Sequence, residues 1–301
     1  MTYDLNTDKD LPGWHDDGTY VSVTNVVFTT SFANARPTTA CGWFADMASL
    51  QTITGMAYLN TSEVTNMRWL FGGCSALRSL DVSNFNTANV TNMSSMFQAC
   101  SGLTGIDLSN INTAKVTNMS QMFYECYNFT SLDVSNFNTA NVINMNNMFD
   151  ECRSLTSLDL SSFNTAMVRY MGWMFGACYA LRTIYVGDGW TTAAVQFSSY
   201  MFSSCYNLVG GQGTIYDYNY VDAAYAHIDG GPSNPGYFTK KSAHRLGDVN
   251  GDGNIDVADV TLLIQAILNS SAIDLGVANM NGDRIIDVVD VTQLIAYILN
   301  I

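Results

Sequence analysis

The sequence predicts an α/β repeat solenoid, in which short strands form a parallel sheet with short helices behind it, and a small all-α domain at the C-terminal end. Three observations predict this architecture. Six cysteines recur at spacings of 26, 26, 26, 26 and 27 residues, and a fixed period of this size is typical of stacked repeats. The hydrophobic period changes within each repeat, and two Asp-rich loops followed by apolar runs occupy the last sixty residues. The cysteines of the series are Cys74, Cys100, Cys126, Cys152, Cys178 and Cys205.

The composition is that of a folded, acidic chain. Of its 301 residues, 48% are hydrophobic, which is enough for a core and excludes wholesale disorder. The 26 Asp and Glu against 12 Lys and Arg give a formal net charge of −14, which repels nucleic-acid backbones and anionic lipid surfaces. No run of 18 apolar residues occurs. We therefore expect no nucleic-acid partner and no membrane insertion.

Each repeat follows the pattern L-x-x-L-D-L-S-x-F-x-T-x-x-V-x-x-M-x-x-M-F-x-x-C. Alternating apolar side chains at residues 80–82 predict a short strand. Val90, Met93, Phe97 and Cys100 then follow at spacings of three and four, which predict one face of a short helix. One unit cannot bury its apolar side alone, but stacked units can, with strands about 4.8 Å apart. We expect the repeats to occupy residues 41–208, with 1–40 and 209–241 as caps that cover the apolar ends.

Stacking aligns equivalent side chains in rows. For the cysteines we expect buried, reduced thiols, although an occasional disulfide or a metal site stays open. The acidic stripe that begins at Asp81 is interpreted as a solvated strand face in preference to a docking surface. We expect the Asn-Thr pairs, such as Asn86 and Thr87, to cap turns. The aromatic row that carries stability comprises Phe97, Phe123, Phe149 and Phe175.

The V-x-N-M-x-x-M-F-x-x-C core of the unit resembles the leucine-rich repeats of BspA-like bacterial surface proteins, over about residues 20–240. The resemblance implies a leucine-rich-repeat solenoid that is secreted or displayed on a bacterial cell surface. It also implies adhesion, through a surface that binds a host protein or a glycan.

The segment DVNGDGNIDVAD, which begins at residue 248, has the oxygen-ligand spacing of a calcium loop. Calcium takes six to eight oxygen ligands. Here they would come from the side chains of every second residue, from one backbone carbonyl and from a carboxylate of the following helix. The expected ligands are Asp248, Asn250, Asp252, the Asn254 carbonyl, Asp256 and Asp259, with Gly253 at the sharp turn. Because four carboxylates repel one another without a cation, we expect the loop to lose its order when calcium is removed.

A second loop, NMNGDRIIDVVD, follows 31 residues later. Its expected ligands are Asn279, Asn281, Asp283, the Ile285 carbonyl, Asp287 and Asp290. Asn replaces the first Asp, and Arg284 replaces the glycine that would ease a positive φ, so we expect this second calcium ion to bind more weakly. Each loop precedes an apolar run. The side chains expected to pack the two halves together are Val260, Ile264, Ile267, Val291, Ile295 and Ile298.

The duplicated loop and helix, over residues 246–301, resemble a type I dockerin. The resemblance implies calcium binding and docking to a cohesin domain of a scaffold protein. The partner-reading positions fall on Val257, Ala258, Val288 and Val289, where many dockerins have Ser-Thr. Two interpretations stay open: a cohesin with a more apolar groove, or packing of these apolar pairs within this chain.

The sequence contains no recognisable catalytic pattern. His15, His227 and His244 lie outside the repeats, and neither G-x-S-x-G nor H-E-x-x-H occurs. A regular stripe of carboxylates also differs from the paired carboxylates of a glycosidase. We therefore expect a non-catalytic binding protein, anchored through its dockerin-like end. The alternatives are a free-standing surface adhesin or structural protein whose C-terminal module only stabilises the chain and, more remotely, a component of a carbohydrate-active enzyme.

Overall fold

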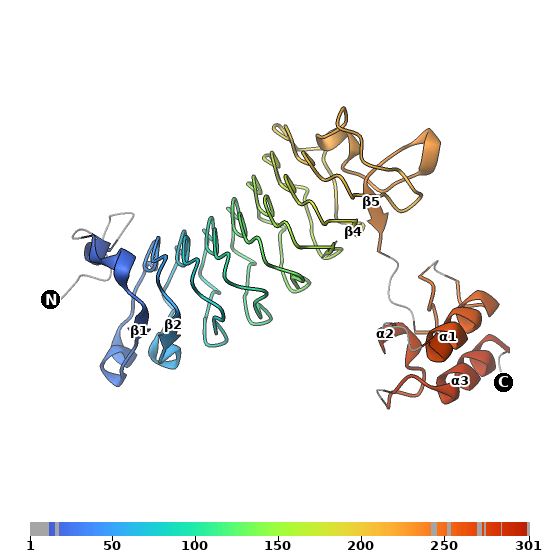
Figure 1. Ribbon diagram of the computed structural model, residues 1–301, viewed down its shortest axis with the longest axis horizontal. Helices are drawn as coiled ribbons and strands as arrows, with labels where there is room; N and C mark the ends of the chain where they lie inside the picture. Colours follow the sequence, from blue (N-terminus) through green and yellow to red (C-terminus); the bar gives the residue numbers. More distant parts are fainter. Residues whose placement is uncertain are drawn as a thin grey trace. The chain divides into compact units, whose positions relative to one another are not determined.

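In the computed structural model the chain forms two compact units, Met1–Lys240 and Lys241–Ile301 (Figure 1). We call them the repeat unit and the C-terminal unit and describe each by itself. The residues that the structure describes are 12–15, 18–241, 246–251, 254–269, 273, 275–283 and 285–299. Within these ranges, no helix has the length and the apolar character needed to cross a membrane.

Regular secondary structure is short and sparse in the repeat unit. Its strands are β1 (Asn25–Val27), β2 (Thr52–Thr54), β3 (Ser157–Leu160), β4 (Thr183–Val186) and β5 (Phe238–Lys240). Its 3-10 helices are η1 (Gly13–His15), η2 (Thr19–Ser22), η3 (Thr30–Asn34), η4 (Met56–Tyr58), η5 (Ala223–Tyr225) and η6 (Gly231–Ser233). The C-terminal unit has the α-helices α1 (Val257–Asn269), α2 (Leu275–Ala278) and α3 (Val288–Leu299).

Successive repeats lie on one another as stacked coils (Figure 1). A column of parallel backbone bridges joins equivalent residues from coil to coil; it runs through Thr39, Asn66, Asn92, Asn118, Asn144, Tyr170 and Phe197. Parallel strands also pair at the two ends of the stack, β1 with β2, and β4 with both β3 and β5. The parallel pairing is therefore confirmed. The predicted continuous sheet is not, because the described strands form two separate sheets.

The short helix predicted for each repeat is wrong. Residues 90–100 form a run of tight turns instead, in which the Cys100 N–H donates to the Phe97 carbonyl and the Phe97 N–H donates to the next coil. Ser95 and Ala99 have positive φ values of 56° and 53°, which a right-handed helix does not allow. The spacing of three and four arises because each turn brings the next apolar side chain back to the core.

The core of the repeat unit consists of rows of equivalent side chains. Phenylalanine rings stack from coil to coil, with centroids 5.3–5.9 Å apart and interplanar angles of 5–12°. The row comprises Phe44, Phe71, Phe97, Phe123, Phe149, Phe175 and Phe202, so it extends beyond the four rings expected from the sequence. Burial of each ring contributes about 1.5–3 kcal/mol to stability.

The cysteine series forms a second buried row. Each thiol donates a hydrogen bond to the carbonyl of a phenylalanine in the preceding coil, with S···O distances of 2.9–3.2 Å. All seven cysteines of the chain are buried, and none of them forms a disulfide bond. The thiols therefore pack the core and satisfy backbone carbonyls that the tight turns leave available.

The Asn-Thr pairs divide two roles between them. Asn112 caps a turn as predicted, because its Oδ1 accepts the Ala114 N–H at 2.9 Å. Thr113 does not cap the turn; its buried hydroxyl bonds to the backbone of the next coil. The acidic stripe also has a local role, since each carboxylate accepts the N–H of the serine two residues later at 2.9–3.0 Å. Its members are Asp81, Asp107, Asp133 and Asp159.

Aromatic side chains cover both ends of the stack. At the N-terminal end, β1 pairs with β2, and the Trp14 indole donates to the Trp43 carbonyl at 2.7 Å. At the other end, β5 pairs with β4 and brings the buried Tyr237 and Phe238 rings edge-on to Phe202, with centroids 5.1 and 5.7 Å away. The apolar faces of the terminal coils are thereby shielded from water.

In the C-terminal unit, α1 and α3 pack against each other around a small core. The fully buried residues of this core are Leu263, Ala278 and Leu294. Ile264 and Ile295 were predicted to pack there, but both are 39% exposed. A step of one residue turns a helical side chain by about 100°, so the neighbouring leucine takes the inward position. The other predicted contacts, Val260, Ile267, Val291 and Ile298, do pack in this core.

Candidate metal centre

The described residues on both sides of the first Asp-rich loop bond to the carboxylate of Asp259, in the first turn of α1. Its Oδ1 accepts the Asn250 N–H at 2.9 Å and its Oδ2 accepts the Asp256 N–H at 2.8 Å. Asp256 in turn accepts the Ala258 N–H at 2.8 Å and so caps α1. These bonds hold both ends of the loop against the helix. Asp248, at the start of the loop, is also buried.

The second loop repeats this geometry around Asp290 in α3. Its carboxylate accepts the Met280 N–H at 2.7 Å and the Asp287 N–H at 2.9 Å. Asp287 accepts the Val289 N–H at 2.7 Å and caps α3. Asn281 also donates its side-chain amide to Asp283 at 2.9 Å. In their described residues, the two loops are therefore structural as well as sequence duplicates.

The predicted ligands are only partly brought together. Hydrogen bonds join Asn250, Asp256 and Asp259 in the first loop, and the equivalent residues in the second. Asn279 accepts the Gly282 N–H at 2.9 Å, whereas Asn254 and Ile285 lie exposed. Asp252 and Gly253, like Arg284, lie outside the described residues. In the part of the chain that is described, no three His, Cys, Asp or Glu side chains form a metal cluster.

The donor set nevertheless fits calcium. Three carboxylates, those of Asp248, Asp259 and Asp290, are almost completely buried, which is costly unless positive charge or hydrogen bonds compensate. The described residues between 246 and 299 include no Lys, Arg or His. The loops offer carboxylate, amide and backbone oxygens, which are the ligands that calcium prefers. When bound, a calcium ion supplies the positive charge that these side chains lack.

The predicted partner-reading residues lie exposed on the first turns of α1 and α3. Val257 and Val288 are 70% and 69% exposed, and Ala258 and Val289 also face solvent. None of the four belongs to the core of the C-terminal unit. The structure therefore does not pack these residues into the core of their own unit, and both interpretations, a cohesin with a more apolar groove and packing elsewhere within the chain, stay open.

Val257 and Val288 each begin an apolar stripe that sequence reasoning missed. The residues at i, i+7 and i+11 share one helical face and are all exposed. On α1 they are Val257, Ile264 and Leu268, and on α3 they are Val288, Ile295 and Leu299. We call these the α1 stripe and the α3 stripe. The signal was present in the sequence, because the same three positions are apolar 31 residues apart.

In comparisons with known proteins, the repeat unit and the C-terminal unit match different families. Residues 246–299 match the model of the dockerin type I domain. Residues 38–133 and 103–214 match the family model described as "Mycoplasma protein of unknown function, DUF285". No curated protein matches the chain.

Among solved structures, a crystal structure of a leucine-rich repeat protein of T. pallidum is similar to the chain. The identity is 16% and the TM-score 0.33, over 69% of this chain and 77% of that one. A similarity this distant carries no functional information. The repeats match their family model over more than half of the chain, so the protein belongs to the BspA-like repeat family described as "Mycoplasma protein of unknown function, DUF285", and its residues 246–299 form a dockerin type I domain.

Proposed function

We propose that the protein is a non-catalytic binding protein, anchored through its C-terminal unit to a cohesin domain of a scaffold protein. The α1 and α3 stripes are the observation that carries this proposal. Each places three exposed apolar side chains on one helical face, beside a loop whose donors fit calcium. Apolar anchors surrounded by polar residues are typical of protein interfaces.

Calcium binding and cohesin binding are coupled in this proposal. Asp259 and Asp290 join each loop to the first turn of its helix, where Val257 and Val288 lie. An ordered loop therefore fixes the direction of the valine that begins each stripe. We propose two calcium ions, the second held more weakly because Asn279 replaces a carboxylate. Since the stripes are equivalent, either of them can dock to a cohesin whose groove is more apolar than usual.

The repeat unit supplies the binding surface that this anchor presents. Its stacked coils form a leucine-rich-repeat solenoid whose polar rows serve the stack: threonines join coils, asparagines cap turns and aspartates accept serine N–H groups. Side chains committed to stacking in every coil are unsuited to catalysis, which supports a binding role. We propose that the protein acts after secretion, on a scaffold or cell surface, in adhesion to a host protein or a glycan.

Calorimetric titration of the full chain against a panel of cohesins, with and without a calcium chelator, tests the anchor. The variants are Val257→Asp, Val288→Asp and the double substitution, with Gln293→Asp as the control, because Gln293 is exposed on α3 but lies off the stripe. We expect calcium-dependent binding that the double substitution weakens at least about a hundredfold, whereas the control leaves it unchanged. Equal binding with and without calcium, or no binding to any cohesin, would refute the proposal.

A further inference from the structure

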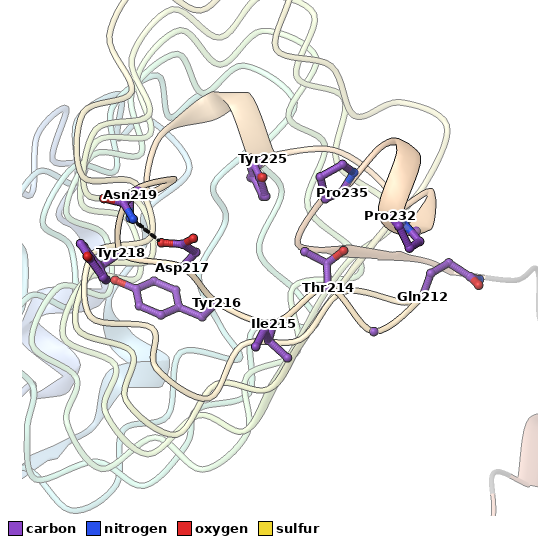
Figure 2. Close-up of a pocket in the computed structure, with 12 residues that line it drawn as sticks. Gln212, Thr214, Ile215, Tyr216, Asp217, Tyr218, Asn219, Tyr225, Pro232 and Pro235 are labelled. Carbon is purple, nitrogen blue, oxygen red and sulfur yellow. Dashed lines mark hydrogen bonds between the residues drawn. The ribbon is translucent and has the colours of Figure 1, made fainter.

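A pocket of about 570 Å³ lies in the segment that covers the C-terminal end of the coils. Its volume is within the range of small-molecule sites. Figure 2 shows its residues arranged around an open space, with residues 212–219 on one side and Tyr225, Pro232 and Pro235 on the other. We propose that this pocket binds a neutral saccharide. The inference rests on the binding role proposed for the repeat unit, and gives that role a site and a class of ligand.

One buried carboxylate joins the two sides of the pocket. Asp229 Oδ2 accepts the N–H groups of Gln212 and Thr214 at 2.8 and 3.0 Å. Its Oδ1 accepts the Thr214 hydroxyl at 2.8 Å and the N–H of Gly231, on the opposite side, at 2.9 Å. Gly231 has a φ of 76°, a conformation that glycine adopts without strain. The pocket is therefore held open before any ligand arrives, which lowers the entropic cost of binding.

Three of the surrounding tyrosines hold the pocket in shape. The Tyr237 hydroxyl accepts the Asp217 N–H at 2.9 Å and donates to the carbonyl of the same residue at 3.2 Å. The Tyr216 hydroxyl accepts the Ser204 N–H at 3.1 Å. The Tyr225 ring contacts that of Tyr237, with centroids 5.0 Å apart. These contacts fix the backbone and the rings on which a ligand would rest.

The side chains of Tyr218 and Gln212 remain available for a ligand. Tyr218 is 76% exposed, and neither its hydroxyl nor the Gln212 side chain hydrogen-bonds to another described residue. Asp217 and Asn219 point into the same region and are joined by a hydrogen bond of 2.9 Å, drawn as a dashed line in Figure 2. The pocket thus alternates aromatic faces with amide and carboxylate groups.

This alternation matches the two surfaces of a sugar ring. The C–H face of a pyranose is apolar and packs on an aromatic ring, whereas its hydroxyl groups donate to carboxylates and exchange hydrogen bonds with amides. A proline-rich peptide needs an aromatic groove that is more uniformly apolar. An anionic ligand is disfavoured because the residues that line the pocket include Asp217 and no basic side chain, in a chain of net charge −14.

A row of tyrosine rings continues from the pocket onto the side of the coils. Tyr216 lies edge-on to Tyr206, with centroids 5.7 Å apart, and Tyr206 stacks on Tyr179 of the preceding coil at 6.2 Å and 7°. Tyr206 and Tyr179 are both exposed. A ligand of several sugar units can therefore extend from the pocket along these rings, so oligosaccharides should bind more tightly than single sugars.

Titration calorimetry on the full, calcium-loaded chain tests the inference. The neutral probes are cellohexaose, xylohexaose, mannohexaose and chitohexaose; the anionic probe is hexagalacturonate and the peptide probe is decaproline. Tyr218→Ala removes the exposed ring of the pocket. Tyr200→Ala is the matched control, since this tyrosine is also exposed but does not line the pocket. Thermal melts check that both variants fold.

We expect at least one neutral hexasaccharide to bind to the unchanged chain. Its affinity should be roughly tenfold lower for Tyr218→Ala and the same for Tyr200→Ala. The inference is wrong if no neutral probe binds, if hexagalacturonate or decaproline binds more tightly, or if the control loses as much affinity as Tyr218→Ala. Cohesin titration of the same variants separates the two proposals. Normal cohesin binding without saccharide binding refutes the pocket alone, whereas saccharide binding without cohesin binding refutes the anchor alone.

Discussion

The Thr113 hydroxyl makes two hydrogen bonds to one residue of the next coil: it donates to the Asn138 carbonyl at 2.9 Å and accepts the Asn138 N–H at 2.7 Å. Thr113 is 1% exposed. The same pair of hydrogen bonds recurs along the stack, in the pairs Thr61–Asn86, Thr87–Asn112, Thr139–Asn164 and Thr165–Thr191. One side chain thus joins two neighbouring coils much as a backbone rung joins two strands of a parallel sheet.

Replacing Thr113 by valine keeps its shape and removes both bonds. We expect Thr113→Val to lower the free energy of unfolding by about 3 kcal/mol, because two backbone groups of Asn138 lose their partner. Thr113→Ser keeps the hydroxyl and should cost only about 1 kcal/mol for the lost methyl group. Urea unfolding followed by circular dichroism measures both. A valine variant as stable as the serine variant would contradict the bridging role.

The cysteine row should be unreactive in the folded protein. Burial raises the pKa of Cys100 to about 12, and burial likewise raises the pKa of the other thiols in the series. Because the thiolate is the reactive form, a thiol reagent at about pH 8 should label none of the series in the native chain. In concentrated guanidinium chloride all seven cysteines of the chain should react. Rapid native labelling of Cys126, followed by mass spectrometry, would show that the coils open.

The repeats could be predicted because near-identical segments must bury the same side chains. The repeated pattern of apolar residues predicted the phenylalanine and cysteine rows and the parallel pairing. It could not distinguish a helix from tight turns, because both return apolar side chains to the core every three or four residues. The difference lies in the positive φ of Ser95 and Ala99, and neither residue type signals that conformation. The bridging role of Thr113 was also hidden, since it depends on which backbone lies opposite.

The spacing of oxygen-bearing side chains predicted two equivalent loops, one before each long helix of the C-terminal unit, and the calcium ions that this spacing indicates stay a prediction. The spacing did not show that Asp259 and Asp290 also accept backbone N–H groups, because those bonds depend on how the loop closes onto the helix. No sequence pattern predicted the pocket whose two sides Asp229 joins. Its two sides come from separate, non-repeating loops, so no periodicity connects them.

Asp150 should make the stability of the repeat unit depend on pH. Burial raises the pKa of its carboxyl to about 6, although Asn147 donates a hydrogen bond to it at 2.7 Å. The folded chain therefore holds this proton up to about pH 6, whereas the unfolded chain releases it near 3.8. Between these values the free energy of unfolding falls as pH rises. Above about pH 6 the folded chain bears the full cost of keeping the buried Asp150 carboxylate ionised.

Asp150→Asn removes this ionisation and should raise the free energy of unfolding by roughly 1–2 kcal/mol at about pH 7.5, with little gain below about pH 4. Denaturant unfolding of both proteins across this range measures the difference. Asp107→Asn, at an exposed carboxylate of another coil, is the control. A gain that is the same at every pH would show that Asp150 acts through packing and not through its charge.

Calcium should bind in two unequal steps that single substitutions can separate. Titration of the calcium-free chain should give two ions per chain, the first bound roughly tenfold more tightly because Asp248 is a carboxylate where Asn279 is not. Asp259→Asn should abolish the tight step and Asp290→Asn the weak one, while Asp107→Asn leaves both intact. Chelation should lower the melting temperature of the C-terminal unit only, because the repeat unit has its own core. If calcium binds in a single step, or if Asp259→Asn and Asp290→Asn each abolish the same step, the two loops act as one site.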